Sequence, residues 1–414
     1  MKTVLSGNLR GGLVALPPTP RLRRYLAPHR LIFIALLVIL GVLLGILGMV
    51  FRFTQGPILY IGIRADAPPL TVCSDADVQT ALAALSPYQP SGMTGFAGLE
   101  DGFFTINDEP FLVRGVNYFP VYYPWRRFLT ESNLSAIDAE FALLRAAGLN
   151  TIRTFLWYEP MFTCPGSGAV PVDDVFARLD GLIHAAAAHD LRIILTLNDT
   201  PDLVNYPLYA NPAHTQAQTA FIVERYHDEA AILMWDVRNE GDIDYGTRDG
   251  ALLAKFPRQQ VLDWVEAVTG QIRSLDSNHL ITAGWMTDAA STAPFVDVIS
   301  FHHWWDDADL RRRIDEIRAV SDHPILLEEF GYPTFPLPED DQAESVRSII
   351  ETAEAAHLAG WLIWTAFDFP LDATCLPPHC PDVENREHHF GIWRSDYTPK
   401  PAAQLVVEMF GGQH

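Results

Sequence analysis

The chain contains 414 residues, 49% of them hydrophobic, which is enough for one large domain and additional segments. The formal net charge is −22 at pH 7; residues 1–52 hold seven Lys or Arg and no acid, so the remainder carries 22 basic against 51 acidic residues. Such an acidic domain repels nucleic acids and anionic lipid headgroups, whereas an uncharged polymer such as a polysaccharide meets no such repulsion.

Residues 31–51 are uncharged and apolar throughout, and a helix of that length crosses a hydrocarbon core of roughly 30 Å. A secretory signal core is shorter, about 7–15 residues, so we predict an uncleaved signal anchor, with a signal cleaved near Asp66 as the alternative. Basic residues stay cytoplasmic. We therefore expect a basic cytoplasmic tail over residues 1–30, a single pass through the cell membrane and an extracytoplasmic domain. The basic residues before the span are Lys2, Arg10, Arg21, Arg23, Arg24 and Arg30.

Residues 52–95 contain scattered Pro and Gly without sustained periodicity, which predicts a linker or stalk with one short helix near residues 75–85. Four cysteines in an exported protein permit disulfides. Cys375 and Cys380 lie five positions apart in a Pro-rich loop, which favours their pairing and leaves Cys73 with Cys164. Three connectivities are possible, and free thiols are a further alternative.

A hairpin is expected over residues 103–115, and from there strand-like and helix-like segments alternate. Eight strands alternating with helices predict a single (β/α)8 barrel over residues 96–414. A doubly wound open sheet would carry a Gly-rich phosphate loop, which the sequence lacks. The expected strands are 112–117, 150–156, 192–198, 231–238, 280–284, 296–302, 324–329 and 361–366. The expected helices are 134–147, 173–189, 214–228, 258–275, 308–320, 341–358 and 402–409, with a short crossover near residues 287–292.

Polar residues recur at the ends of these strands, where a parallel barrel carries its chemistry. Two of them are acids that follow apolar runs: Glu240 in Ala231-Ile-Leu-Met-Trp-Asp-Val-Arg-Asn-Glu240, and Glu329 in Pro324-Ile-Leu-Leu-Glu-Glu329. Such a pair is what glycoside hydrolysis with retention requires, one general acid/base and one nucleophile. The strand-end set is Asn117, Arg153, Asn198, Asn239, Glu240, His302, His303, Glu329 and Trp364.

The order and spacing of these motifs resemble glycoside hydrolase clan A, especially family 5, which contains cellulases and mannanases. The resemblance covers about residues 100–410. It is carried by Phe111-Leu-Val-Arg-Gly-Val-Asn117-Tyr118, Gly148-Leu-Asn-Thr-Ile-Arg153, Trp235-Asp-Val-Arg-Asn239-Glu240, Ser300-Phe-His302, Glu329-Phe-Gly331, Gly360-Trp-Leu-Ile-Trp364 and the closing Gly391-Ile-Trp-Arg-Ser-Asp-Tyr-Thr-Pro-Lys400. It implies that Glu240 is the acid/base and Glu329 the nucleophile.

The remaining site residues are expected to bind substrate or to support the acids. Arg153 would keep Glu329 charged, Asn239 would bind the sugar 2-hydroxyl, and Trp364 would stack under the ring. The substrate-binding set is Arg153, Asn239, His302, Trp364, Asn117, Asn198 and Trp304. Trp304 departs from the family pattern, in which a Tyr two positions after the histidine contacts the nucleophile.

Several positions have two interpretations. Glu328 competes with Glu329, but only Glu329 directly precedes Phe-Gly, and successive strand side chains face opposite ways. His302 could be a core histidine, and His303 is a weaker candidate. Trp157, Tyr158, Trp285 and Trp305 are either sugar platforms or core. His379, His388 and His389 suggest a metal only by their number, so we expect no metal and no cofactor.

The sequence therefore predicts a monomeric, membrane-anchored retaining O-glycosyl hydrolase of β-linked polysaccharides or oligosaccharides. One alternative is a transglycosylase acting on surface polysaccharide, which would use every residue named here. A second alternative, which is not an enzyme, is an inactive carbohydrate-binding protein. The identity of the glycan stays open, because the subsite loops decide it.

Overall fold

The computed structural model describes residues 70–200, 203, 208–210, 212–245, 256–375 and 378–412. Among these residues, no helix is long and apolar enough to cross a membrane. The predicted tail (1–30), the predicted anchor (31–51) and residues 52–69 of the predicted linker lie outside the described residues.

Eight parallel strands form one sheet, in the order β10-β9-β8-β5-β4-β13-β12-β11. The two edge strands meet through a parallel bridge between Trp285 and Phe301, so the sheet closes into a barrel. The strands are β4 (Val113–Asn117), β5 (Thr151–Phe155), β8 (Arg192–Thr196), β9 (Ile232–Asn239), β10 (Leu280–Gly284), β11 (Ile299–His303), β12 (Ile325–Phe330) and β13 (Gly360–Ile363). All eight predicted strands are present and parallel, which confirms the barrel.

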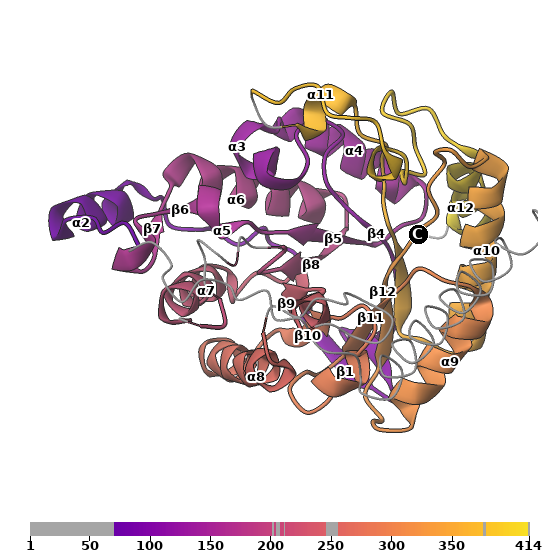
Figure 1. Cartoon of the computed structure of the whole chain (residues 1–414), viewed down its shortest axis with the longest axis horizontal. Coiled ribbons are helices and arrows are strands. Elements are labelled where there is room, and N and C mark those ends of the chain that lie inside the picture. The colour runs from indigo at the N-terminus through magenta and orange to yellow at the C-terminus, as the bar shows by residue number, and fades with distance from the viewer. Residues whose placement is uncertain are drawn as a thin grey trace, which may run out of the picture. The chain divides into compact units, whose positions relative to one another are not determined.

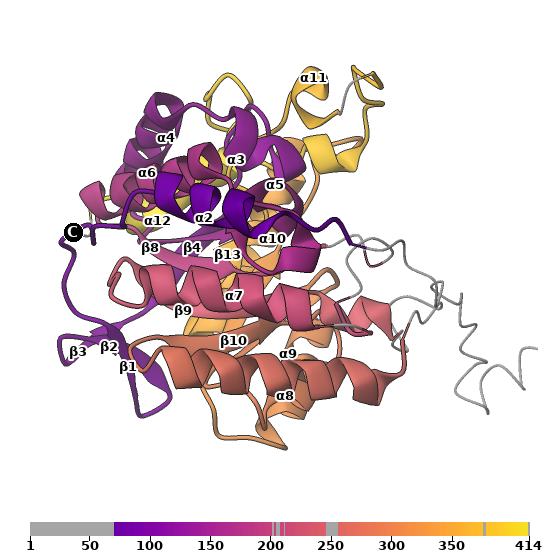
Figure 2. The same ribbon diagram turned by 90° about the vertical axis from the view of Figure 1, so that its left-hand side faces the viewer.

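Helices follow the strands and cover the outer face of the sheet, as Figures 1 and 2 show. Their apolar faces and the outer faces of the strands form one continuous core. The main helices are α4 (Leu134–Ala146), α6 (Asp173–Ala188), α7 (Ala213–Tyr226), α8 (Arg258–Leu275), α9 (Asp307–Arg318), α10 (Glu339–Ala355) and α12 (Pro401–Phe410), and the fifth crossover is the short η5 (Ala289–Thr292).

Short elements fill the connections at the carboxyl ends of the strands. They are η2 (Trp125–Arg127), α3 (Phe128–Glu131), α5 (Tyr158–Met161), β6 (Phe162–Thr163), η3 (Pro165–Ser167), β7 (Val170–Pro171), η4 (Gly241–Asp244), α11 (Leu371–Thr374) and η6 (Arg386–His388). The longer barrel connections therefore lie at the end where parallel barrels carry their sites.

A three-stranded antiparallel sheet covers the amino end of the barrel: β1 (Ala97–Glu100), β2 (Phe103–Ile106) and β3 (Glu109–Phe111). β2 and β3 form the expected hairpin, with Asn107 and Asp108 at φ +54° and +66° in the turn. Phe104 is fully buried and packs with inward-facing strand residues, including Val113 and Leu326, so it closes that end of the barrel.

Residues 70–95, which the sequence placed in a linker, lie against the barrel. Helix α2 (Asp75–Ala84) matches the expected short helix and lies beside β7 (Figure 1). Tyr88 donates a hydrogen bond to Glu229 over 2.6 Å, and Arg192 donates to the carbonyls of Gly95 and Thr94. We call residues 70–95 the strap. These contacts place the strap against the barrel, on the other side of the boundary that we predicted at residue 96.

Both disulfides that the spacing favoured are present. Cys73 bonds Cys164 across 91 positions and joins the strap to the loop after β6, and Cys375 bonds Cys380 within a loop near the end of the chain. The first bond attaches the strap covalently at the carboxyl end of the barrel, whereas Glu229 and Arg192 hold it at the amino end. The strap therefore runs along the whole side of the barrel.

Candidate active site

Two carboxyl groups meet at the carboxyl end of the barrel. Glu240 follows β9 in the left-handed region at φ +49°, a backbone conformation that non-glycine residues rarely adopt and that ends the strand. Glu329 lies in β12. A carboxylate oxygen of each acid and a ring nitrogen of His302 all lie within 4.8 Å of one another. Retaining glycosidases hold their two carboxyl groups about 5–5.5 Å apart, so this separation fits retention.

Arg153 is the centre of the buried network beneath these acids. Its Nη1 lies 3.1 Å from Glu329 Oε2, and its Nη2 lies 2.7 Å from Asp236 Oδ2. The same guanidinium donates to the side-chain oxygens of Asn117 and Asn239, each over 3.0 Å. Asp236 was not among the predicted site residues, although a carboxylate inside an apolar strand needs a buried partner and could have signalled one.

Burial bears on the roles expected for three residues. Arg153, Asn117 and His302 are 0% exposed and contact other site residues, and Arg153 lies beside Glu329 as expected. Asn117 fixes Arg153 and donates to the backbone carbonyl of Glu328 over 3.0 Å. The side chains of Glu240 and Glu329 are 17% and 7% exposed, so the two acids reach the solvent-exposed opening at the carboxyl end of the barrel, which we call the mouth.

Glu328 and Glu329 are consecutive residues of one strand, yet both face Arg153. The Nε atom of Arg153 lies 3.6 Å from Glu328 Oε1, and Glu328 is fully buried. The register of β12 shifts against both of its neighbours at this position, where Leu327 pairs with Trp361 but Phe330 pairs with Ile363. Such an irregularity breaks the two-residue alternation, so the expectation that the two side chains face opposite ways is wrong here.

Opposing charges and burial set the protonation of the site. Burial lowers the pKa of His302, but Glu329 and Glu240 outweigh it and raise that pKa to about 10. Burial raises the pKa of Glu240. The hydrogen bond from His302 Nδ1 over 2.9 Å and the positive charge of His302 outweigh burial, so the pKa of Glu240 lies below its ordinary value. Burial raises the pKa of Glu329 to about 7, against the charges of His302 and Arg153. The charges of Glu329 and Glu240 therefore favour a proton on His302, beside Glu240.

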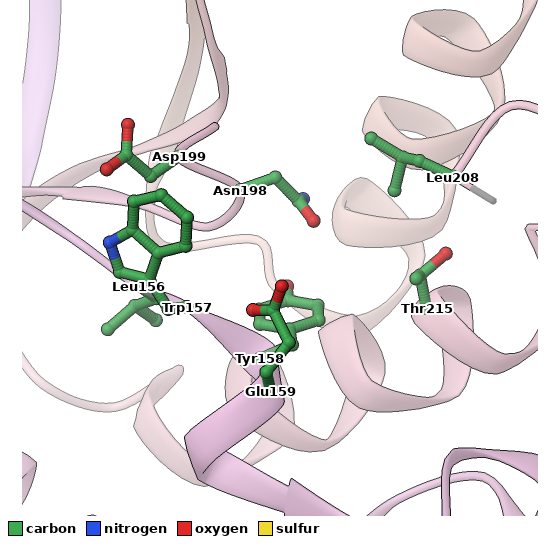
Figure 3. Close-up of a pocket in the computed structure, with 8 residues that line it drawn as sticks. All are labelled: Leu156, Trp157, Tyr158, Glu159, Asn198, Asp199, Leu208 and Thr215. Carbon is green, nitrogen blue, oxygen red and sulfur yellow. The ribbon is translucent and has the colours of Figure 1, made fainter. Parts of the chain in front are cut away.

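Figure 3 shows a pocket whose lining includes Asn198 and Asp199, which follow β8. Asp199, one position beyond the predicted Asn198, accepts a hydrogen bond from Asn239 Nδ2 over 2.9 Å, and burial raises its pKa to about 6. Asn198 donates to the carbonyl of Val237, which fixes the turn that presents Asp199. Sequence analysis missed Asp199, although it directly follows a strand-end Asn. The pocket is lined by Leu156, Trp157, Tyr158, Glu159, Asn198, Asp199, Leu208 and Thr215.

The aromatic candidates separate into core and mouth. Trp285 is fully buried and donates to the Tyr245 hydroxyl, and Tyr158 is buried beside Thr219, although one edge lines the pocket. Trp364 is partly exposed and packs edge-on against Phe155, with ring centroids 6.0 Å apart. The other mouth aromatics are Trp157 at 8% exposure, Trp305 at 41%, and Trp304, which packs against Phe390.

Glu240, His302 and Glu329 are close enough to surround a metal ion, but Arg153 and a protonated His302 already supply two positive charges among these acids. A divalent cation would meet both charges at short range, so we assign none. His388 contacts Thr374 and Asn385, and His389 pairs with Glu384. His303 is buried 3.6 Å from Asp309. These histidines support loops of the fold.

The model of the cellulase family, glycosyl hydrolase family 5, matches residues 105–367. The chain belongs to glycosyl hydrolase family 5. Among curated relatives, mannan endo-1,4-beta-mannosidase F of Aspergillus clavatus is 27% identical over 65% of this chain and 71% of its own length. Mannan endo-1,4-beta-mannosidase 1 of Solanum lycopersicum is 26% identical over 66% of this chain and 83% of its own length.

Solved structures with the same fold include exo-beta-1,4-mannosidase Op5Man5 from Opitutaceae bacterium strain TAV5. Its TM-score is 0.64 at 20% identity, over 76% of this chain and 62% of that one. The endo-1,4-beta-mannanase from Rhizomucor miehei gives 0.56 at 19% identity, over 76% of this chain and 99% of that one. This family 5 protein is thus an O-glycosyl hydrolase of β-linked glycans, and the family 5 resemblance drawn from its motifs is confirmed.

Proposed function

We propose that Glu240 is the acid/base and Glu329 the nucleophile of a retaining double displacement. The observation that carries the assignment is the separation of their carboxylate oxygens, within 4.8 Å, at the carboxyl ends of β9 and β12. Glu329 attacks the anomeric carbon while protonated Glu240 donates to the leaving oxygen. Glu240 then removes a proton from the water that releases the sugar.

The proton for the first step is stored beside the acid. His302 Nδ1 donates to Glu240 Oε1 over 2.9 Å, so shifting that proton along the existing hydrogen bond gives a neutral imidazole and a protonated Glu240. Arg153 remains charged beside Glu329 and stabilises its carboxylate. The reactive state therefore differs from the resting state by one short proton shift.

β-Mannan is the substrate that we propose to test first. The relatives named above carry mannan endo-1,4-beta-mannosidase in their names, and the acids themselves do not select the sugar. Purified protein should be compared on β-mannan, glucomannan and β-glucan, with reducing ends as the readout. Products formed at high acceptor concentration separate hydrolysis from transglycosylation, which uses the same residues.

The assignment is tested by Glu240→Gln and Glu329→Gln, which keep size and remove the carboxylate. Each should lower kcat on the best glycan by more than about a thousandfold. Glu140→Gln is the matched control, because Glu140 is a buried carboxyl in α4 whose partners are Tyr118, Tyr397 and the amide of Val121. Near-wild-type activity in either site variant would refute the assignment.

Residues 31–51 are proposed to anchor the protein in the cell membrane, with the barrel outside the cytoplasm. The proposal is supported by the apolar run and by six basic residues before it. Protein from the native host should sediment with membranes and be cleaved by protease added outside the cytoplasmic membrane. N-terminal sequencing that finds a soluble form starting near Asp66 would show a cleaved signal instead.

A further inference from the structure

Glu328 is a buried carboxylate that the double displacement does not use. It is 0% exposed, and among the described residues neither of its oxygens has a hydrogen-bond partner. By contrast, Asp236, the other buried acid beside Arg153, accepts from Arg153, from Thr196 over 2.7 Å and from the amide of Gly284. A buried carboxylate that accepts no hydrogen bond is costly even beside a cation, so the presence of Glu328 at this position calls for a role.

The imidazole of His302 lies beside Glu328 and has an unused hydrogen-bonding position. Its Nε2 lies 3.8 Å from Glu328 Oε2 and, within the part of the chain that the structure describes, has no hydrogen-bond partner, whereas its Nδ1 faces Glu240. The imidazole thus lies between two carboxylates, one on each ring nitrogen. At 3.8 Å the Glu328 carboxylate acts on an Nε2 proton through its charge, and both side chains are fully buried.

The other charged groups near Glu328 leave this arrangement unchanged. Arg153, from β5, has its Nε 3.6 Å from Glu328 Oε1, and this cation is shared with Asp236 of β9 and with Glu329. Glu240 and Glu329 lie on the Nδ1 side of His302, at 2.9 and 3.7 Å. The Nε2 side faces Glu328, so Glu328 is the group that attracts a proton there.

A neutral imidazole carries one N–H donor and one acceptor nitrogen, and the hydrogen bond at one nitrogen sets the state of the other. A proton held at Nε2 leaves Nδ1 free to accept from protonated Glu240. A proton held at Nδ1 would instead point at Glu240 and favour its charged form. The tautomer of His302 therefore decides whether Glu240 can keep the proton that the leaving oxygen needs.

We propose that Glu328 is a positioning residue that holds His302 in its Nε2–H form and so allows the Nδ1 proton to pass to Glu240. The proposal rests on the assignment of Glu240 as the acid/base. In the first step Glu329 bonds to the anomeric carbon, the bond to the glycosidic oxygen breaks, and one proton moves from Nδ1 to Glu240 and on to that oxygen. In the second step the oxygen of a water replaces Glu329 at the anomeric carbon, the water proton passes to Glu240 and back to Nδ1, and the Nε2 proton stays in place throughout.

The proposal predicts an effect that depends on the leaving group. Glu328→Met keeps the length of the side chain and removes its charge and acceptor, whereas Glu328→Gln keeps an acceptor oxygen. An unactivated β-linked oligosaccharide needs a proton on its leaving oxygen, whereas the 2,4-dinitrophenyl glycoside of the same sugar does not. The fold-decrease in kcat/KM caused by Glu328→Met should be at least about ten times larger on the oligosaccharide than on the dinitrophenyl glycoside. Glu328→Gln should show a smaller difference.

The control is Glu140→Gln, which should change both substrates by the same factor. Equal losses on both substrates in Glu328→Met, or no loss, would overturn the role of Glu328 and leave the proposed function standing. A wild-type protein that cleaves neither substrate would contradict the proposed function, and the second measurement then decides the role of Glu328.

That measurement is the ¹⁵N spectrum of histidine-labelled full-length Glu240→Gln protein, in which a neutral amide replaces the acid. The His302 signal is assigned by its loss on further replacement with Asn. We expect a neutral His302 to carry its proton on Nε2, and an Nδ1–H form would overturn the proposal. The introduced amide can either donate to Nδ1 or accept from it, so it does not favour one tautomer. The nitrogen that carries the proton therefore shows whether Glu328 attracts it to Nε2.

Discussion

Asn239 donates a hydrogen bond from Nδ2 to Oδ1 of Asp199 over 2.9 Å, while its own Oδ1 accepts from Arg153 over 3.0 Å. The two contacts fix which end of the amide faces which neighbour. An amide nitrogen has two N–H donors, so one remains for a sugar hydroxyl. Asp199 thereby sets the direction in which Asn239 presents that donor.

Asp199→Ala should reduce kcat/KM on the preferred glycan by about tenfold to a hundredfold, since a hydrogen bond to a charged group contributes about 1.5–3 kcal/mol. Asp199→Asn keeps an acceptor oxygen and should lose less. Burial raises the pKa of Asp199 to about 6, so Asp199 is protonated below pH 6. The ratio of kcat/KM between wild type and Asp199→Asn should therefore become smaller below pH 6. Steady-state kinetics at pH 5 and pH 8 would contradict this if the ratio were constant.

Gly284→Ala should disable the site by steric conflict. A Cβ at this position would lie 2.5 Å from Glu328 Oε2, 2.7 Å from Arg153 Nη2 and 3.0 Å from His302 Nε2. These atoms are held in the buried network, so we expect kcat to fall at least about a hundredfold, as when a site is displaced by an ångström. Gly270→Ala in α8 is the matched control, because its Cβ meets nothing within 4 Å. It should retain activity and gain about 0.5–1 kcal/mol of stability.

Arg153→Met should destabilise the fold because it leaves Asp236, Glu328 and Glu329 without their shared cation. Removing one partner of a buried ion pair costs about 3–5 kcal/mol in the free energy of unfolding. Arg153→Lys keeps the charge but cannot reach the same set of oxygens, so its stability should be intermediate. Urea unfolding measures all three proteins, and a loss below about 1 kcal/mol for Arg153→Met would contradict the account.

Glu140 makes the stability depend on pH. Burial raises its pKa from the ordinary 4.5 to about 7, although Tyr118 and Tyr397 donate to it. The folded state therefore holds this proton more tightly than the unfolded state. Its contribution is present in full below pH 4.5 and is lost as the pH rises through 7.

Glu140→Gln cannot ionise, so its free energy of unfolding should fall less than that of wild type between pH 4.5 and pH 8. The difference between the two proteins should change by about 3 kcal/mol over this interval. Other titrating groups are common to both proteins and cancel. If the difference in free energy of unfolding between wild type and Glu140→Gln were the same at pH 4.5 and pH 8, Glu140 would have an ordinary pKa in the folded protein.

The barrel and its two acids could be predicted because they depend on local patterns. Apolar runs that end in Asn239-Glu240 and Glu328-Glu329-Phe330 indicate strands and sites in short windows of sequence. The roles within the site depend on contacts between distant strands. Arg153 and Asn117 proved to be fully buried supports only once β5, β9 and β12 were assembled around them.

Three acids escaped the sequence analysis or were placed wrongly by it, each for a physical reason. Asp236 sits within an apolar strand and is neutralised by Arg153, 83 positions away. Asp199 lies one position beyond Asn198, the last residue of the predicted strand. Glu328 faces the site because the register of β12 shifts, which a regular alternation cannot foresee. The pairing of Cys73 with Cys164 was predicted, but the strap has no periodic apolar pattern, so the rest of its packing against the barrel could not be distinguished from a linker.

The Cys73–Cys164 bond also determines where a mechanical load enters the domain. A pull on the chain before residue 70 passes from Cys73 directly into the loop at the carboxyl end of the barrel. Helix α2 and the contacts of Tyr88 lie beyond that point in the chain, so the disulfide gives the load a covalent route that bypasses them. The domain would therefore resist being peeled open from its N-terminal side, and the load would enter beside the catalytic mouth, on its rim.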